Sequence, residues 1–307
     1  MGLELPILES SPLAHLARPA WLKVRLPGGE SYTRVKGLVR RLELHTVCES
    51  ARCPNVAECW GQGTATFMIL GNLCTRACGF CAVPHGKPLG LDEDEPRRVG
   101  KAVAAMRLRY AVVTSVNRDD LGDGGASIFA ETIRAIRRHQ PGCKVEVLVP
   151  DFGGNGAALA TVVEAAPEVL NHNTETVPRL YRRVRKGAGY ERSLELLRRA
   201  KQLSRSLGTQ MPTKSGIMVG LGESYEEIRE TLRDLRAQDV DILTVGQYLQ
   251  PTKQHLPLVR FYHPEEFAQI KRDALGLGFK HVEAGPLVRS SYHAQEQEAA
   301  AGTRLRG

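Results

Sequence analysis

The sequence lacks long apolar runs and contains few aromatic residues. No stretch reaches the roughly 18 apolar residues without charges that a membrane-spanning helix needs. Phe, Trp and Tyr make up 6% of the 307 residues, and the basic residues behind the net charge of +8 are spread over several segments. Nucleic-acid-binding proteins usually gather such residues in one stripe with aromatic residues between them. We therefore expect neither a membrane protein nor a nucleic-acid-binding protein.

The chain also lacks the features of a secreted, disulfide-linked domain. Its first residues, Met1 to Pro6, have neither the basic nor the apolar region of a signal peptide. Disulfide frameworks are typical of short secreted domains with an even number of cysteines, whereas this chain has 307 residues and seven cysteines. Its content of 42% apolar and 25% charged residues is that of an ordinary globular enzyme. We expect reduced cysteines, a cytoplasmic location, and one large α/β domain or two smaller ones.

Six of the seven cysteines form two groups of three. The first group has the spacing C-x4-C-x5-C and the second C-x3-C-x2-C: Cys48, Cys53 and Cys59, then Cys74, Cys78 and Cys81. Structural zinc usually takes four closed ligands, often in C-x2-C pairs. A [4Fe–4S] cluster has four irons and binds thiolates, so three cysteines leave one iron free for another ligand. The pattern favours two such clusters, although the thiolates alone leave a site for another metal open.

Short apolar runs alternate with amphipathic segments through most of the chain. The predicted strands are 64–70, 110–116, 144–149, 169–172, 216–220 and 242–248, with a last extended stretch at 281–288. The predicted helices are 32–44, 95–108, 127–139, 156–165, 190–207, 224–237 and 264–277. Such alternation predicts βαβ units and parallel pairing. Since six units fall short of a closed eight-stranded barrel, we expect a partial (β/α)6 barrel, with a flat doubly wound sheet as the alternative.

The boundaries predict three parts. An N-terminal arm with the first cysteine group spans 1–63, the partial barrel spans 64–280, and a C-terminal extension spans 281–307. Trp21 is expected to hold the arm against the barrel, and residues 294–307 are expected to be a frayed tail. The polar segments that follow the predicted strands should gather at the carboxyl ends of those strands, where such folds carry their chemistry.

The second cysteine group follows the first predicted strand, with Phe80 before its last cysteine, as in radical S-adenosylmethionine (radical SAM) enzymes. Together with the first group it resembles one family of that superfamily, the lipoyl synthases. The likeness continues through residues 114–125, 171–176, 215–223, 247–251 and Arg289-Ser-Ser-Tyr292. It covers about residues 18–293. The C-x3-C-x2-C motif alone indicates only the superfamily, whereas both groups together with residues 289–292 are highly specific.

The resemblance implies two [4Fe–4S] clusters and S-adenosylmethionine as cofactors. Cys74, Cys78 and Cys81 would bind the cluster that reductively cleaves S-adenosylmethionine to a 5′-deoxyadenosyl radical. The expected contacts to that cofactor are Phe80, Gly220 and Gly222 for adenine, Thr114 and Ser115 for the methionyl amino group, and Asn173 and Glu175 for ribose or substrate. Read alone, the Gly-x-Gly pair is more often a simple turn.

Cys48, Cys53 and Cys59 would bind a second cluster that donates sulfur. Its fourth ligand is expected to be the hydroxyl of Ser290, with Ser291 as the next candidate. Serine is a harder and weaker partner for this iron than thiolate, which suits a cluster that must be dismantled. By its chemistry alone, Ser290 is as well explained as a turn cap. Cys143 lies outside both groups and reads as a small buried apolar residue, and His172 reads as a positioned neutral imidazole.

The implied reaction inserts two sulfurs at C6 and C8 of an octanoyl group linked to a lysine of a lipoyl carrier domain. Expected partners are such domains of 2-oxoacid dehydrogenase E2 subunits and the glycine cleavage H protein, an electron donor such as ferredoxin or flavodoxin, and an iron–sulfur carrier for cluster repair. The densest basic segment, 182–186, fits best a solvated helix face, with an acidic partner, a phosphate or a carboxylate as the alternative occupants.

Two other functions remain compatible with parts of the pattern. Another two-cluster radical SAM enzyme, of the biotin-forming or methylthio-transferring kind, would not predict C-x4-C-x5-C upstream of the second group. An iron–sulfur electron-transfer or regulatory protein would explain the six cysteines but not the βαβ units that end in polar clusters.

Overall fold

The computed structural model describes residues 17–23, 28–50, 53, 55–56, 60 and 66–303. Its centre is an eight-stranded sheet in the order β1-β2-β3-β4-β5-β6-β7-β8. The strands are β1 His45–Thr46, β2 Thr66–Ile69, β3 Tyr110–Ser115, β4 Lys144–Leu148, β5 Val169–Asn171, β6 Thr213–Val219, β7 Ile242–Gln247 and β8 His281–Gly285. β1 pairs antiparallel with β2, and every later neighbouring pair is parallel. β1 and β8 are the edges, so the sheet is an unclosed barrel.

This sheet confirms the predicted partial barrel. All six predicted strands form, and β8 adds a seventh parallel strand within the stretch expected to be extended. A doubly wound sheet reverses its strand order at a switch point, whereas here the strands follow one another in sequence order. The division at residues 63 and 280 stays a prediction.

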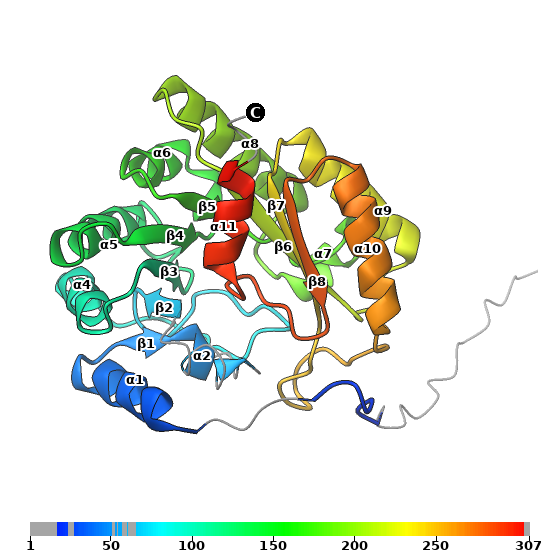
Figure 1. Cartoon of the computed structure of the whole chain (residues 1–307), viewed down its shortest axis with the longest axis horizontal. Coiled ribbons are helices and arrows are strands. Elements are labelled where there is room, and N and C mark those ends of the chain that lie inside the picture. The colour runs from blue at the N-terminus through cyan, green and yellow to red at the C-terminus, as the bar shows by residue number, and fades with distance from the viewer. Residues whose placement is uncertain are drawn as a thin grey trace, which may run out of the picture.

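The curved sheet is surrounded by helices, most of them on its outer face (Figure 1). They are α1 Glu30–Arg41, α2 Val47–Ser50, α4 Glu95–Ala105, α5 Ala126–His139, α6 Gly156–Glu164, α7 Tyr181–Val184, α8 Tyr190–Ser206, α9 Tyr225–Ala237, α10 Pro264–Gly276 and α11 Ala294–Thr303, with short 3-10 turns at Phe152–Gly154 and Pro178–Leu180. Local sequence fixes several starts. The Asn155 side chain accepts from two backbone N–H groups of α6, and Ser224 forms a capping box with Glu227 at the start of α9.

The two faces of the strands have different surroundings. On β3, Ala111 and Val113 belong to the apolar core that includes the outer helices, whereas Tyr110 and Val112 pack with Ala294 of α11. Because side chains alternate along a strand, α11 must lie on the inner face. Lys144, the first residue of β4, is paired with Glu298 of α11 at 2.6 Å. α11 therefore covers the amino ends of the strands.

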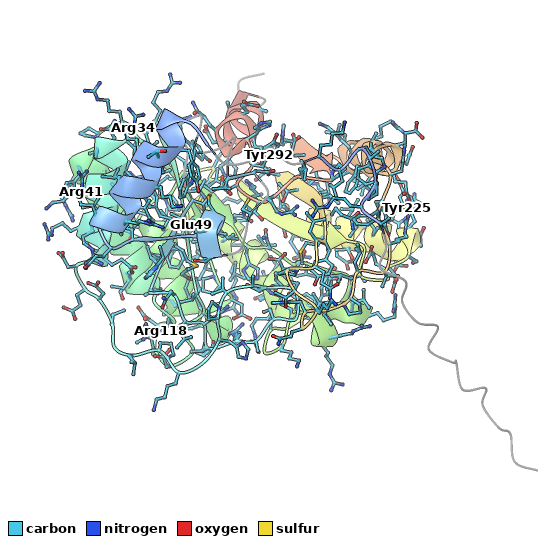
Figure 2. The ribbon with its side chains drawn as sticks, turned by 90° about the horizontal axis from the view of Figure 1, so that it is seen from below. Arg34, Arg41, Glu49, Arg118, Tyr225 and Tyr292 are labelled. Atoms are coloured by element: carbon cyan, nitrogen blue, oxygen red, sulfur yellow. The ribbon has the colours of Figure 1, made fainter. Side chains whose placement is uncertain are left out.

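The prediction of a frayed tail at 294–307 was wrong for the part that the structure describes. α11 buries Ala294, Gln297 and Ala301 although its sequence has no clear apolar stripe. Residues 304–307 lie outside the described chain. In Figure 2, Tyr292, just before α11, and Arg118, which follows β3, lie toward opposite edges of the molecule. α11 thus occupies the amino ends of the strands, and the cysteine groups lie toward the opposite, carboxyl ends.

Two further expectations concern the periphery. Trp21 makes edge contacts with the rings of Phe261 and His263, at centroid distances of 6.3 and 6.1 Å, which confirms that it holds the N-terminal arm against the barrel. Among the helices that the structure describes, none is long and apolar enough to cross a membrane.

Candidate active site

The second cysteine group lies in a tight loop just after β2. The Cys74 N–H donates to the carbonyl of Pro84 at 2.9 Å, and the Cys81 N–H donates to the carbonyl of Cys78 at 3.2 Å. Two backbone N–H groups, from Arg76 and Asn117, donate to the Cys74 sulfur at 3.4 and 3.3 Å. The loop thus presents its thiols together, and hydrogen bonds to sulfur of this kind tune iron–sulfur sites.

The three thiols are free and close enough to influence one another. Burial raises the pKa of Cys78 to about 12; the charge of Arg185 opposes this shift, and Cys81, Glu175 and Cys74 add to it. Burial likewise raises the pKa of Cys81 to about 11. Three neighbouring thiolates therefore need a strong positive partner, and a metal centre supplies one.

The donor set of three thiolates on one loop fits a [4Fe–4S] cluster, which binds thiolates at its irons. Across the described ranges, no three His, Cys, Asp or Glu side chains converge on one ion position. A [4Fe–4S] cluster takes one thiolate at each of its corner irons, so its ligands stand apart around a cube.

Two members of the first cysteine group also lie together. Cys48 is buried on α2, and burial, followed by the nearby Cys53, raises its pKa to about 11. Burial raises the pKa of Cys53 as well, while a backbone hydrogen bond at Asn55 and the charge of Arg289 oppose that shift. Cys59 lies outside the described residues. The structure therefore places two of the three predicted ligands side by side.

The segment around residues 287–291 passes between the first cysteine group and the inner face of the sheet. The Asn55 side chain donates to the carbonyl of Leu287 at 2.7 Å, and the Thr66 hydroxyl donates to Ser291 Oγ at 2.9 Å. The Asn173 side chain donates to Ser290 Oγ at 2.6 Å. Each serine is thus held from a different direction, one by β2 and one by the loop after β5.

The Arg289 side chain is close enough to Cys53 and to Glu175 for its charge to act on the pKa of both. Burial lowers the pKa of Arg289, and the charges of Cys53 and Glu175 act against that shift. Burial in turn raises the pKa of Glu175. The charge of Arg185, a hydrogen bond from Asn173 and the charge of Arg289 oppose this rise. Glu175 also has a left-handed backbone, with φ of 69°, a strained conformation that is common at functional sites. Arg289 therefore links the surroundings of the two cysteine groups.

The residues predicted to contact S-adenosylmethionine gather at the carboxyl ends of the strands, as expected. The Thr114 hydroxyl donates to the carbonyl of Leu148 at 2.9 Å. Ser115 Oγ and Asn173 Oδ1 are buried, and neither has a hydrogen-bond partner within the described structure. Buried polar atoms are nearly always paired. Two orphaned oxygens beside the cysteine loop therefore fit a site that receives the polar groups of a ligand. Phe80 packs on the apolar cluster that includes Leu256.

The backbone conformation of the fold explains why glycine occupies positions 220 and 222. Gly220 and Gly222 have φ of 108° and 103°, values that favour glycine. Backbone N–H groups of Gly220 and Leu221 donate to the Glu223 carboxylate at 2.5 and 2.9 Å. A side chain at position 220 would meet the Gln247 amide. The structure therefore supports the turn interpretation, and an approach to adenine stays a prediction.

Arg185 is a site residue that the sequence did not reveal. It lies in the basic run 182–186, but its side chain is buried and donates to the Asn173 carbonyl and the Tyr181 hydroxyl, each at 2.7 Å. Burial and the charge of Arg185 lower the pKa of His172 to about 3, so this imidazole is neutral, as predicted. Nothing in the local sequence distinguishes Arg185 from its exposed neighbours.

The fold and the two cysteine groups define a radical SAM enzyme. The model of the radical SAM superfamily matches residues 68–235, and that of the N-terminal domain of lipoyl synthase matches residues 8–53. Among solved structures, methylornithine synthase aligns over 83% of both chains with a TM-score of 0.53 and 18% identity. The hydrogenase maturase HydG of Carboxydothermus hydrogenoformans covers 88% of this chain and 78% of its own, with a TM-score of 0.54 and 14% identity. These two show the fold alone.

Sequence relatives are more specific. The lipoyl synthase of Koribacter versatilis is 59% identical over 97% of this chain and 96% of its own. That of Rubrobacter xylanophilus is 63% identical over 91% of this chain and 86% of its own. The chain belongs to the lipoyl synthase family. It is accordingly a radical SAM enzyme of the sulfurtransferase type, with S-adenosylmethionine and [4Fe–4S] clusters as cofactors.

Proposed function

We propose that the chain inserts two sulfur atoms at C6 and C8 of an octanoyl group carried on a lysine of a lipoyl carrier domain. The observation that carries this proposal is the path of the C-terminal segment. Ser290 is hydrogen-bonded to Asn173, while Arg289 is close enough to both Cys53 and Glu175 for their charges to interact. The segment thus connects the first cysteine group to the strand ends where the second group lies, as two-cluster chemistry on one substrate requires.

We assign one cluster to each cysteine group. Cys74, Cys78 and Cys81 hold the cluster that, when bound, cleaves S-adenosylmethionine to a radical able to abstract an unactivated hydrogen. Cys48, Cys53 and Cys59, with Ser290 as the fourth ligand, hold the cluster that supplies the sulfurs. Ser290 Oγ already accepts from Asn173, which would orient its lone pairs.

We assign the cofactor contacts to side chains around the second group. Ser115 Oγ and Asn173 Oδ1, both orphaned, receive polar groups of S-adenosylmethionine. Thr114, Phe80, Glu175, Gly220 and Gly222 complete that site. Arg185 holds the Asn173 carbonyl in place and balances the charge of Glu175. The buried strand ends keep water away from the reaction.

The carrier domains of 2-oxoacid dehydrogenase E2 subunits and of the glycine cleavage H protein are the proposed substrates. The electron donor is a ferredoxin or flavodoxin, and an iron–sulfur carrier rebuilds the consumed cluster. We propose a cytoplasmic location for the enzyme, together with these partners.

A single-turnover assay under argon tests the proposal. Reconstituted protein, dithionite, S-adenosylmethionine and an octanoyl-lysyl peptide are combined, and products are read by mass. We expect the peptide to gain two sulfurs and lose two hydrogens. Cys78→Ala should abolish formation of 5′-deoxyadenosine, whereas Cys53→Ala should still form it but leave the peptide without sulfur.

Cys143→Ala is the matched control. Cys143 is buried, and burial raises its pKa to about 11, so it is an inert thiol outside both groups. This variant should keep full turnover. If Cys53→Ala still inserted sulfur, the assignment of the first group as the sulfur source would be wrong. If the unsubstituted protein formed 5′-deoxyadenosine and left the peptide unchanged, the substrate assignment would fail.

A further inference from the structure

A basic segment lies directly against the loop of the second cysteine group. The Gly79 N–H, between Cys78 and Cys81, donates to the carbonyl of Val184 in α7 at 2.9 Å. A side-chain carbon at position 79 would lie 3.3 Å from the Arg183 carbonyl. Backbone contacts therefore fix α7 and the residues after it to this loop, although some hundred residues of chain separate them.

Three cations of this segment are exposed and unpaired. Arg182, Arg183 and Lys186, here called the basic patch, have no ion pair within the described part of the chain. The neighbouring Arg179, by contrast, is paired with Glu227 at 2.6 Å. Unpaired like charges side by side repel one another, so the patch does nothing for the stability of the fold.

The patch borders a hollow that reaches the cysteine loop. The hollow has a volume of about 540 Å³, and Lys186 and Arg192 line it together with Thr75, Arg76 and Ala77. These last three residues are the ones that separate Cys74 from Cys78. Asp119, the acidic residue in the wall, is already paired with Arg76 at 2.6 Å. Arg192 is paired with Asp151 at 3.3 Å. Lys186 is then the lining cation without an ion pair in the described chain, and the net charge at the wall of the hollow is positive.

We propose that the basic patch and this hollow are where an acidic one-electron carrier protein docks to reduce the cluster of the second group. The inference rests on the proposed function. The carrier loses one electron, the cluster passes it to the sulfonium, and the bond between sulfur and C5′ breaks to give methionine and a 5′-deoxyadenosyl radical. Two such electrons are needed for two sulfur insertions.

Two physical reasons favour this partner at this place. Electron transfer through protein weakens steeply with distance, and the lining residues 75–77 lie between Cys74 and Cys78, two of the three ligand cysteines. Transient redox contacts are small and rely on charge complementarity, which mainly sets the rate of encounter. A patch of three free cations beside a hollow supplies such complementarity without a large apolar interface.

Charge reversal tests the inference. The test variant combines Arg182→Glu, Arg183→Glu and Lys186→Glu. The matched control reverses three other exposed cations, Lys101 of α4 and Arg107 and Arg109 before β3, and so changes the net charge equally. Binding of oxidised flavodoxin to each reconstituted protein is measured by biolayer interferometry, and 5′-deoxyadenosine formation is measured with reduced flavodoxin and with dithionite.

We expect flavodoxin to bind the test variant about 10-fold more weakly or worse at low ionic strength, with a smaller difference at high salt. Formation of 5′-deoxyadenosine should slow accordingly with flavodoxin and stay unchanged with dithionite. The control should match the unsubstituted protein. Failure of the dithionite reaction in every protein would count against the proposed function, whereas the binding comparison bears on the docking surface alone.

Three results would overturn the inference. Flavodoxin affinity could be unchanged in the test variant, or it could fall equally in the control, which would make net charge the cause. The third is a slower dithionite-driven reaction on an octanoylated carrier domain, but not on the octanoyl peptide, with flavodoxin binding intact. That result would assign the patch to the carrier domain instead.

Discussion

Replacing Gly220 by alanine would place a methyl group against a buried amide. The added carbon would lie 2.2 Å from Gln247 Nε2 and 2.7 Å from the Arg260 carbonyl, both well inside van der Waals contact. Gln247 is fully buried, and its amide nitrogen donates to the carbonyls of Val219 and Arg260 at 3.0 and 3.1 Å. Gln247 therefore cannot move aside without breaking these hydrogen bonds.

The expected cost has two parts. The positive φ of Gly220 makes any side chain there unfavourable by about 1–2 kcal/mol. Displacing Gln247 leaves a buried donor without its partners, which costs about 1–3 kcal/mol more. Gly222 offers a matched comparison, because its φ is nearly the same but its added carbon would lie at an ordinary 3.6 Å from Val259. Gly222→Ala should therefore lower the free energy of unfolding only by the cost of the positive φ.

The measurement is urea denaturation of both variants, followed by circular dichroism under anaerobic, reducing conditions. We expect the free energy of unfolding to fall by about 2–5 kcal/mol for Gly220→Ala and by about 1–2 kcal/mol for Gly222→Ala. Equal losses, or a larger loss at position 222, would refute the packing argument. In the stable Gly222→Ala variant, weaker binding of S-adenosylmethionine would then support a backbone approach to adenine.

Three further predictions concern polar side chains of the barrel and of the C-terminal segment. Lys214 is paired with Glu146 at 2.9 Å, and both side chains are fully buried. Lys214→Met should therefore lower the free energy of unfolding by about 3–5 kcal/mol, because it leaves a buried charge unpaired. Adding Glu146→Gln should recover much of that loss, as chemical denaturation can measure. Burial by itself would raise the pKa of Asp151, but its arginine partner lowers it to about 2. Ionised Asp151 thus contributes about 2 kcal/mol to the free energy of unfolding at pH values above roughly 4, its pKa in the unfolded chain. This contribution is lost as the pH falls toward 2. Asp151→Asn should be less stable than the parent at pH 7, and the difference should shrink below about pH 4 and nearly vanish by about pH 2; a constant difference across that range would contradict this. Ser290→Ala should change the electron paramagnetic resonance of the first-group cluster and stop sulfur insertion, while Ser291→Ala should leave both nearly intact. The reverse outcome would make Ser291 the ligand.

Local features of the chain could be predicted from the sequence. The strands β2 to β7 and the helices between them follow from apolar periodicity and capping residues, which act within a few residues. The spacing of the cysteines is likewise a local property, since ligands of one cluster on one loop must be close in sequence. The gathering of polar segments at the strand ends then follows from parallel connectivity.

Other features depended on which distant segments meet. Ser290 and Asn173 are 117 residues apart, and no local pattern shows that their side chains are hydrogen-bonded. Arg185 belongs to a run of basic residues, and only the position of α7 decides that this one points inward while its neighbours stay exposed.

The sequence by itself thus determined the partial barrel, the two cysteine groups and the family, because periodicity and motif spacing depend only on residues that are close in the sequence. Tertiary structure decided the course of the C-terminal segment. α11 has no apolar stripe of its own, and Ala294 and Ala301 become buried only because the inner face of β3, β5 and β7 is already in place to receive them. Arg289 likewise gains its neighbours only after the sheet has formed. Burial and charge depend on the surroundings, and the assembled fold supplies those surroundings.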